Sequence, residues 1–437
     1  DRLRSRGLGD VYKRQVQRRG IIGLFCLLFV ASSVVPGWAQ KDNRFEVSKN
    51  LDIFNSLLKE VEMFYVDSVD VDKTVQRGIE AMLAGLDPYT EYYPEQKTEE
   101  LSLMTTGEYG GIGSLIRQRN NEGGVMIAEP TEGMPADLAG LKPGDLILAI
   151  DTIDVSKATN SRVSELLKGV PNTKMVLTIQ RPGEKKPRKF EITRKQITTP
   201  QVTYYGVKND SIGYIYLKAF TIKSAQEVKE AFLDLKKNHN IKSLVLDLRG
   251  NGGGVLEGAV QIVGMFVPKG SEVLSTKGKI KQWDRTYRTS TEPLDTVMPL
   301  AILINGGTAS AAEIVSGSLQ DMDRAVLVGQ RSFGKGLVQA PRDLPYNGKV
   351  KITMSKYYIP SGRCIQQIDY SHRKEDGSVA AIPDSLTSVF YTSKKRPVRD
   401  GGGVRPEFEV KEPKVPTMMY YLAADTVLFD FVEQDRI

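Results

Sequence analysis

The apolar positions of this chain follow a helical period in some segments and a strand period in others. Residues 44–105 have a helical pattern, and their first apolar stripe consists of Phe45, Val47, Leu51, Phe54, Leu57, Leu58, Val61, Phe64 and Tyr65. A second helix is predicted over residues 75–86, because Pro88 follows it and stops a helix. Such a stripe packs into a core or against a partner helix, and the more specific expectation is a homodimer formed through this region.

Residues 107–195 change to short strands separated by glycine turns. Strands are predicted at 114–119, 125–129, 146–150 and 174–180, with a helix at 161–167. This order resembles a PDZ domain. In that family a glycine-rich turn offers N–H groups to the terminal carboxylate of a peptide, which adds a strand to the sheet edge. The resemblance implies this role for the turn Gly110, Gly111, Ile112 and Gly113, while the simpler interpretation is a tight turn alone.

Residues 196–410 alternate apolar strands with amphipathic helices. Strands are predicted at 212–216, 243–248, 300–304 and 325–328, and helices at 224–236, 256–266 and 310–319. Continuous apolar runs such as residues 243–248 are typical of strands buried in a sheet. Residues 366–400 are polar and poorly patterned, and a terminal helix is expected within residues 417–437.

Together these patterns predict an α+β multidomain protein with an N-terminal helical region, a PDZ domain and a mixed βα core. The expected boundaries are 1–39 for a signal peptide with a non-native start, 40–106 for the helical region, 107–195 for the PDZ domain, 196–410 for the core and 411–437 for a C-terminal tail.

The net charge of +7 is concentrated at the start of the chain. Residues 1–39 hold seven basic and two acidic residues, which leaves a net charge of +2 for residues 40–437. A nearly neutral body gives no electrostatic reason to expect nucleic-acid binding.

The basic start fits a secretory signal. Arg18 and Arg19 precede the apolar run 21–35, which is followed by Pro36-Gly37-Trp38-Ala39. Small residues at Gly37 and Ala39 predict cleavage after Ala39. The alternative is an uncleaved anchor helix, the one route by which this chain would touch a membrane, although the run is short for a membrane span. We expect export to the periplasm or cell envelope of a bacterium.

Cysteines and histidines are scarce. Of the two cysteines, Cys26 lies in the signal segment, which leaves Cys364 without an intramolecular disulfide partner after cleavage. No cysteine and histidine spacing suits a metal, so neither a metal site nor a cofactor is expected.

Ser310 is a candidate nucleophile. It follows the predicted strand 300–304 and a glycine turn, and it begins a predicted helix. The N–H of Ala311 at this helix start could stabilise an oxyanion. The competing interpretation is a capping box formed by Ser310 and Glu313, with Thr308 as a rival cap, and neither requires catalysis.

A serine nucleophile needs a base. His239 and His372 lie in polar loops, and nothing in their local sequence links either one to Ser310, so a Ser-His-Asp triad is a minor alternative. Lys335 lies between Gly334 and Gly336 in a partly apolar loop. Burial disfavours the charged form of a lysine, so a buried Lys335 could act as the base.

Two nucleotide-binding motifs are nearly but not fully present. Residues 329–335 match a P-loop except that Gly336 replaces the serine or threonine that binds Mg²⁺, and the chain that follows is extended rather than helical. The turn 250–254 lacks dinucleotide-binding spacing because Val255 stands where the last glycine belongs. This turn could instead supply an oxyanion N–H, or be only a strand-to-helix turn.

Read in order, these segments resemble the carboxyl-terminal processing proteases, which are Ser–Lys peptidases with an embedded PDZ domain. The resemblance covers residues 51–410, and its landmarks are Leu86-Asp87-Pro88-Tyr89-Thr90, the PDZ turn, Asp247-Leu248-Arg249-Gly250-Asn251-Gly252-Gly253-Gly254, Thr308-Ala309-Ser310-Ala311-Ala312-Glu313, Ser332-Phe333-Gly334-Lys335-Gly336 and Gln339. One departure is Ala312, where many members have a second serine.

The resemblance implies a role for each site residue. Ser310 would be the nucleophile, Lys335 the general base and Gln339 the residue that orients Lys335, while Gly253 and Ala311 would supply oxyanion N–H groups. The implied activity is that of an exported serine endopeptidase that cuts proteins at or near their C-termini. Its PDZ domain would recognise those termini and gate the active site, and an adaptor protein could assist. The alternative is a catalytically silent PDZ scaffold.

Overall fold

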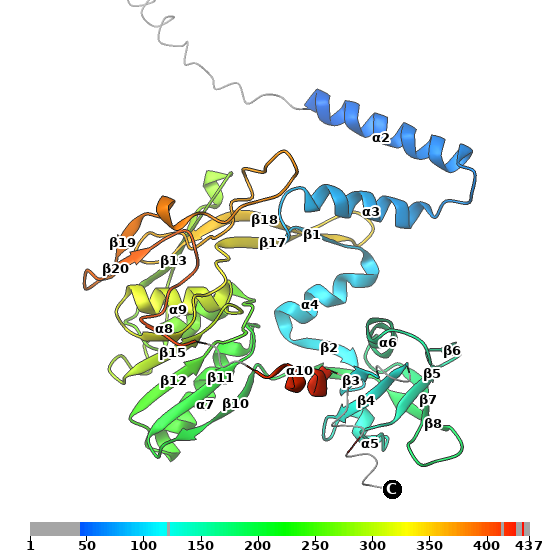
Figure 1. The fold of residues 1–437 in the computed structure, drawn as a ribbon, viewed down its shortest axis with the longest axis horizontal. Coiled ribbons are helices and arrows are strands. Elements are labelled where there is room, and N and C mark those ends of the chain that lie inside the picture. Colours follow the sequence, from blue (N-terminus) through cyan, green and yellow to red (C-terminus); the bar gives the residue numbers. More distant parts are fainter. Residues whose placement is uncertain (1–43, 120–122, 412–414, 425–430, 432–437) are drawn as a thin grey trace, which may run out of the picture. The chain divides into compact units, whose positions relative to one another are not determined.

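The computed structural model describes residues 44–119, 123–411, 415–424 and 431 (Figure 1). The predicted signal segment, with Cys26, and most of the predicted terminal helix lie outside these residues. Of that helix, α10 (Thr417–Ala424) is described. The described chain divides into two units, with the boundary between Gly78 and Ile79.

The N-terminal region contains the helices that the apolar pattern predicts. These are α2 (Arg44–Phe64), α3 (Val71–Ala84) and α4 (Thr98–Thr106), of which α3 begins four residues before its predicted start. No side chain of α2 is buried, and most of its apolar stripe is exposed, with Leu58 and Val61 half-buried. The structure also has a short strand, β1 (Glu91–Tyr93), that the helical interpretation of residues 44–105 missed. Within the described residues, no helix is both long and apolar enough to cross a membrane.

Residues 108–198 form the predicted small β domain. Its elements are β2 (Glu108–Gly111), β3 (Ser114–Gln118), β4 (Val125–Pro130), α5 (Pro135–Leu138), β5 (Leu146–Ile150), β6 (Ile153–Asp154), α6 (Asn160–Leu167), β7 (Lys174–Gln180), β8 (Arg188–Thr193) and β9 (Lys195–Thr198). The main sheet has the order β3-β4-β5-β7-β8, and β2 pairs with β9. Asp145 is fully buried and accepts a 2.7 Å hydrogen bond from Arg181 Nε, which compensates its buried charge.

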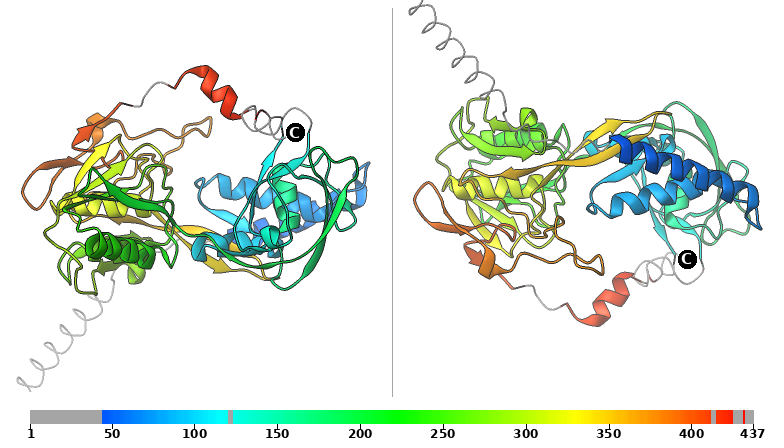
Figure 2. Two further views of the ribbon diagram at one scale, coloured as in Figure 1. Left: turned by 90° about the horizontal axis from the view of Figure 1, so that it is seen from below. Right: turned by 90° about the horizontal axis from the view of Figure 1, so that it is seen from above.

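A six-stranded sheet forms the centre of residues 202–409. Its elements are β10 (Val202–Lys208), β11 (Ile212–Leu217), α7 (Ser224–Asn238), β12 (Ser243–Asp247), α8 (Leu256–Gly264), β15 (Leu300–Ile304), α9 (Ala311–Asp321), β16 (Val326–Gly329) and β21 (Phe408–Glu409). The strand order is β10-β11-β12-β15-β16-β21, and every pair except β10–β11 is parallel. The predicted apolar face of α7 is buried in one core with α8, α9 and this sheet (Figures 1 and 2, green to yellow).

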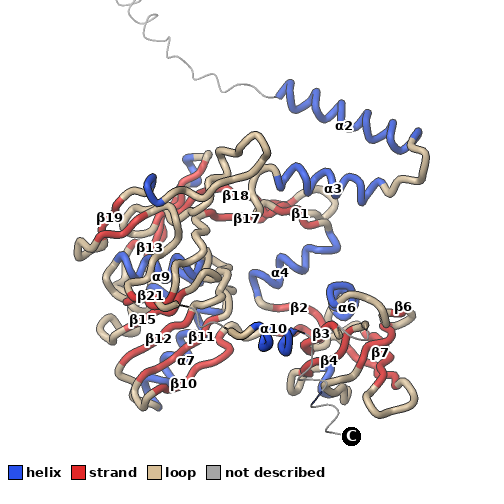
Figure 3. Tube along the Cα trace, in the orientation of Figure 1, coloured by secondary structure: helices blue, strands red, loops and turns tan. Residues whose placement is uncertain are grey.

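A second, antiparallel sheet was not predicted. It contains β1, β13 (Glu272–Gly278), β14 (Arg285–Arg288), β17 (Leu337–Asp343) and β18 (Lys349–Tyr358), and β17 and β18 form its long ribbon (Figure 3). Most residues of β18 are half-buried on both faces, so the strand lacks the apolar alternation that reveals strands in a sequence. The remaining short elements are η1 (Glu95–Lys97), η2 (Lys281–Trp283), η3 (Asp384–Leu386), β19 (Val389–Tyr391) and β20 (Pro397–Arg399).

The parallel sheet determines where a site can form. The loops after β12, β15 and β16 all leave the carboxyl edge of neighbouring strands. In open α/β sheets this edge is where ligands bind. The three loops contain Gly253, Ser310 and Lys335, so the topology brings the candidate residues to one edge.

A buried ion pair anchors the end of α9. Arg363 is 2% exposed, and its guanidinium donates to Asp321 Oδ1 and Gln320 Oε1, each at 2.8 Å, and to the Arg399 carbonyl at 3.0 Å. Asp321 is fully buried and has no other cation beside it among the described residues. Removal of Arg363 would therefore leave an uncompensated buried carboxylate.

We expect Arg363→Met to destabilise the protein by about 3–5 kcal/mol, because it leaves the buried Asp321 carboxylate without a compensating charge. Thermal unfolding followed by calorimetry measures the change. The matched control is Arg288→Met, which removes the exposed pair between Arg288 and Glu272 at 2.7 Å and should cost about 1 kcal/mol or less. Equal losses in the two variants would contradict the assignment.

Candidate active site

The three loops at the carboxyl edge are joined to one another. The Ala309 N–H donates to the Asn251 carbonyl at 2.9 Å, and the Phe333 N–H donates to the Thr308 carbonyl at 2.9 Å. Gly253 approaches Ser310 so closely that an added Cβ would lie 2.7 Å from the Ser310 Cβ. Its φ of 96° is also disfavoured for any other residue, so both space and backbone require glycine at this position.

Ser310 has a strained backbone at the start of α9. Its φ of 55° and ψ of −117° are rare for a residue with a side chain and cost about 1–3 kcal/mol. The conformation is held from both sides: the Ser310 N–H donates to Glu313 Oε2 at 2.8 Å, and the Ser310 carbonyl accepts from the Tyr357 hydroxyl at 3.3 Å. The Glu313 bond belongs to the predicted capping box, so the cap and an active-site role are compatible.

The Glu313 carboxylate connects the serine and lysine loops. Glu313 is fully buried and accepts hydrogen bonds from the N–H groups of Ser310, Gly334 and Lys335 at 2.8, 2.7 and 2.9 Å, and from the Ser332 hydroxyl. Burial raises the pKa of Glu313, whereas the four donors favour its charged form. All four partners are donors, so the ionised carboxylate is the form that satisfies them. Sequence analysis found Glu313 only as a helix cap.

The Lys335 side chain is half-buried against an aromatic ring, with Lys351 and several carboxylates nearby. Its Nζ is 4.2 Å from the centre of the Tyr89 ring, which is a cation–π contact. Burial, followed by the nearby charge of Lys351, lowers the pKa of Lys335 to about 8. Among the described residues, no hydrogen bond joins Lys335 Nζ to Ser310 Oγ.

Gln339 contacts a different partner from the one that the resemblance implies. Its side-chain amide donates to Thr353 Oγ1 at 3.1 Å, and that hydroxyl donates to Asp87 Oδ1 at 3.2 Å. The structure contains no hydrogen bond between Gln339 and Lys335 in its described part. The chain Gln339–Thr353–Asp87 instead links β17 through β18 to the segment before β1.

The two candidate oxyanion donors differ in their present partners. The Ala311 N–H is in the first turn of α9 and has no acceptor among the described residues. The Gly253 N–H donates to Asn251 Oδ1 at 2.9 Å. Gly254, which lines the cavity beside Ser310, was not singled out because nothing in a run of three glycines distinguishes them by sequence.

A cavity of about 440 Å³ opens beside Ser310. Ser310, Gln339 and Lys351 line it, and most of its wall is apolar, formed by Leu101, Met104, Leu256, Ile314, Leu337 and Val338. The cavity therefore combines a mostly apolar wall with Ser310 and a lysine, Lys351, while Lys335 is not part of its lining.

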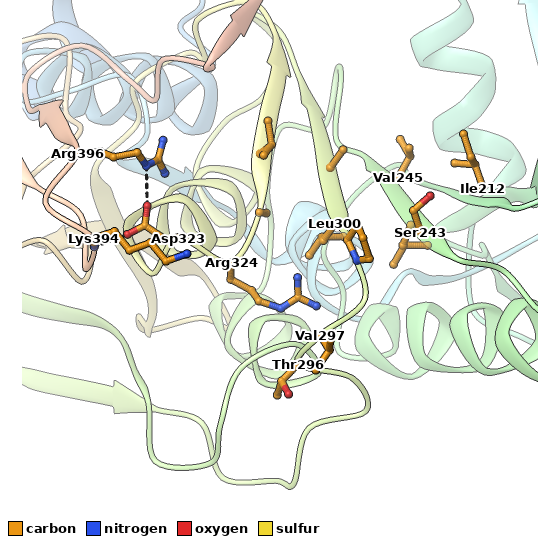
Figure 4. Close-up of a pocket in the computed structure, with 15 residues that line it drawn as sticks. Ile212, Ser243, Val245, Thr296, Val297, Leu300, Asp323, Arg324, Lys394 and Arg396 are labelled. Carbon is orange, nitrogen blue, oxygen red and sulfur yellow. Dashed lines mark hydrogen bonds and ion pairs between the residues drawn. The ribbon is translucent and has the colours of Figure 1, made fainter.

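A larger cavity lies at the opposite end of the parallel strands. Its volume is about 840 Å³, and it is lined by Ile212, Ser243, Leu300 and Val326 near the amino ends of β11, β12, β15 and β16 (Figure 4). Its Arg396 is already paired with Asp323 at 2.6 Å. None of the candidate catalytic residues lines this cavity, so its size does not make it the active site.

The alternative chemistries gain no support from the geometry. His239 pairs loosely with Asp234 at 3.8 Å and His372 with Asp369 at 2.6 Å, and both histidines are exposed. Neither contacts Ser310 in the described chain. The P-loop-like residues lead into β17 rather than a helix. Within the described residues, no group of three His, Cys, Asp or Glu side chains could hold a metal ion.

Of the predicted PDZ turn, Gly110 and Gly111 are the last residues of β2 and pair with β9, and only Ile112 and Gly113 lie between β2 and β3. Gly113 has a φ of 67°, and the carbonyls of Ile112 and Gly113 accept from the N–H groups of Ala136 and Thr131 at 2.8 and 3.0 Å. Strand β3 pairs only with β4 among the described strands, and α6 contacts β3. An open strand edge therefore lies beside a helix and begins at the glycine turn.

Comparisons with known proteins agree with this arrangement. Residues 211–371 match the model of peptidase family S41, and residues 126–181 match a PDZ domain. A carboxy-terminal-processing protease of Bartonella bacilliformis is 36% identical over 345 residues, which is 78% of this chain and 77% of the relative. A probable CtpA-like serine protease of Staphylococcus aureus is 33% identical over 320 residues, which is 72% of this chain but only 62% of the relative.

A solved photosystem II D1 C-terminal processing protease is 26% identical and covers 83% of this chain and 88% of its own, with a TM-score of 0.43. The family assignment rests on the sequence relatives. Together with the PDZ match, they confirm the predicted resemblance, the predicted fold class and the predicted serine-peptidase activity. The chain therefore belongs to the carboxy-terminal-processing serine proteases of peptidase family S41.

Proposed function

We propose that this protein is an exported endopeptidase that cuts proteins at or near their C-termini with Ser310 as nucleophile and Lys335 as general base. The observation that carries the proposal is the buried Glu313 carboxylate, which binds the backbone N–H of both residues. This link holds the serine loop and the lysine loop at the same sheet edge. The strained backbone of Ser310 adds support, because such strain concentrates at active sites.

The proposed reaction uses neutral Lys335. As Ser310 Oγ attacks the carbonyl carbon of the substrate, its proton moves to Lys335 Nζ. The developing oxyanion accepts a hydrogen bond from the Ala311 N–H. It can accept a second one from the Gly253 N–H once that group releases Asn251 Oδ1. The lysine ammonium then protonates the leaving amine. Water, deprotonated by the same amine group of Lys335, hydrolyses the acyl-enzyme and frees Ser310.

Catalysis requires a side-chain rearrangement from the arrangement described above. Lys335 Nζ must leave the Tyr89 ring to reach Ser310 Oγ, and Gln339 must exchange Thr353 for Lys335 to orient the base. Each change involves rotation about side-chain bonds, and the backbone bonds to Glu313 can persist. Substrate binding would favour the aligned arrangement if the substrate binds that arrangement more tightly.

The PDZ domain is proposed to capture the substrate's C-terminus and to gate this rearrangement. A peptide would add a strand to the open edge of β3, with its carboxylate at the turn formed by residues 110–113. Helix α4 runs directly into β2, and the Ile222 N–H of the core donates to the Thr105 carbonyl at 3.0 Å. Since α4 also lines the cavity beside Ser310, it gives a physical route from peptide binding to the active site.

The proposed setting is the periplasm or cell envelope, based on the signal-like residues 18–39.

Helix α2 has an exposed apolar stripe that includes Leu51, Phe54 and Leu57, which suits a homodimer. Sedimentation equilibrium of the chain with and without residues 44–64 tests the dimer.

Proteins or peptides with exposed C-termini are the proposed substrates, and an adaptor protein could deliver them.

The first test is cleavage of an unfolded protein with an apolar C-terminus. We expect Ser310→Ala and Lys335→Ala each to lower kcat/KM by at least about 10³-fold, because the nucleophile and its base act as a unit. The control is Lys374→Ala, which removes an exposed cation. Equal cleavage by all variants would overturn the mechanism, and peptide binding without any cleavage by the wild type would favour a scaffold.

The second test is the pH dependence of kcat/KM. Lys335 is inactive as a base while protonated, so kcat/KM should rise about tenfold per pH unit below the pKa of Lys335 and level off above it. With that pKa lowered to about 8 by burial and Lys351, the midpoint should lie near pH 8. A midpoint at the ordinary pKa of lysine, about 10.4, would contradict the lowered pKa of Lys335, and a midpoint far below pH 8 would point to another base.

The third test is Glu313→Gln. The amide must turn an NH₂ group toward at least one of the four donors, so we expect a loss of about 1–3 kcal/mol in stability. We also expect a drop of at least about 10²-fold in kcat, because the alignment of a nucleophile and its base is sensitive to small displacements. Ser332→Ala, which removes one donor, is the milder control. A fully active Glu313→Gln enzyme would show that the carboxylate does not align the loops.

A further inference from the structure

A second lysine lies in the active site and has no part in the Ser–Lys mechanism. Lys351, on β18, lines the cavity that also contains Ser310 and Gln339. Its ammonium group contacts Glu91 Oε2 at 2.5 Å and the Tyr93 hydroxyl at 3.2 Å. Glu91 and Lys351 are also directly opposite each other in the pairing of β1 with β18. The pair is thus fixed by both backbone register and side-chain contact.

The segment that carries Glu91 also contacts the catalytic lysine. Glu91 and Tyr93 lie on one face of β1, and Tyr89 lies in the turn just before it, where its N–H donates to Asp87 Oδ1 at 2.8 Å. The Tyr89 ring contacts Lys335, and Glu91 and Tyr93 contact Lys351. One short segment therefore holds both lysine side chains near each other.

The two charges of the pair act on Lys335 in opposite directions. A positive charge near a lysine disfavours its protonated form, and a negative charge favours it. Lys351 lowers the pKa of Lys335 after the larger effect of burial, whereas Glu91, Asp87 and Glu313 raise it. Tyr370 is a further titratable group beside Tyr89, and the two hydroxyl groups are 3.5 Å apart. A lysine near another cation in an apolar site is a known way to obtain a neutral amine.

We propose that Lys351 and Glu91 form a charge pair that controls how readily Lys335 gives up its proton, with Lys351 acting as a positioning residue rather than a catalytic one. The proposal rests on the proposed function, because it concerns the same base. It also gives β1 a regulatory role: displacement of Glu91 exposes Lys335 to the uncompensated charge of Lys351. Since β1 leads through η1 into α4, a substrate that moves α4 could release this charge.

The competing explanation is an ordinary cross-strand ion pair that only stabilises the β1–β18 pairing. Under that explanation, Lys351→Met and Glu91→Gln would lower stability similarly and leave the pH profile unchanged. Under the proposal, the two variants would move the profile in opposite directions. The sign of the shift therefore separates electrostatic control from structural support.

The experiment compares the pH dependence of kcat/KM in the full-length enzyme and its variants with one peptide substrate. Loss of the Lys351 cation should raise the midpoint by about half a pH unit or more, and loss of the Glu91 anion should lower it by a similar amount. Lys351→Arg retains the charge and should keep the wild-type midpoint. Lys349→Met is the matched control, because it removes a cation of β18 whose pair with Asp343 is exposed, and it should cause no shift.

The remaining outcomes also decide between the explanations. Shifts of the same sign in Lys351→Met and Glu91→Gln, or unmoved midpoints with activity retained, would overturn the proposal. If Lys351→Met does not fold, Lys351→Gln removes the charge with a polar side chain and should show the same upward shift. Wild-type activity that does not depend on Ser310 and Lys335 would overturn the proposed function instead, which keeps the two failures distinguishable.

Discussion

The candidate active site depends on one buried carboxylate. Glu313 is fully enclosed, and its oxygens are occupied by three backbone N–H groups and one hydroxyl from two separate loops. Those four bonds satisfy a charge that would otherwise be very costly to bury. Because they go to backbone and serine groups, the carboxylate fixes the lysine loop without a direct ion pair to the Lys335 ammonium. The backbone of this loop is fixed, while the Lys335 ammonium contacts the Tyr89 ring.

The two sheets contribute different parts of the site around this carboxylate. The parallel sheet presents the loops with Ser310 and Lys335, and the antiparallel sheet supplies the surrounding side chains. Strand β18 contains Lys351 and Thr353 before an irregularity in its pairing with β17, and Tyr357 after it. They contact Glu91, Gln339 and the Ser310 carbonyl, respectively. A single strand thus contacts Glu91, Gln339 and Ser310.

Most of the fold could be predicted from the sequence where burial is one-sided. The strands at 146–150, 174–180 and 300–304 and the apolar face of α7 match the structure, because core contact imposes a clear period on their residues. Residues 337–341 of β17 were expected to be extended, but β1 and β18 were missed, because β1 has three residues and β18 does not alternate between buried and exposed positions. The candidate nucleophile and base could be found by their motifs. Tyr89 and Lys351 could not, because their contacts with Lys335 and Glu91 join residues far apart in the chain, 260 positions in the Lys351–Glu91 pair, and one sequence gives no signal for such contacts.

The small β domain enters and leaves the core through paired strands. Strand β2 begins the insertion and β9 ends it, and the two are hydrogen-bonded neighbours from Glu108–Thr198 to Gly111–Lys195. The Thr199 N–H closes the same junction by donating to the Gly107 carbonyl at 2.9 Å. An insertion whose two ends meet imposes almost no separation on the host chain. The core can therefore accommodate the small β domain at this junction while its own strand order stays intact.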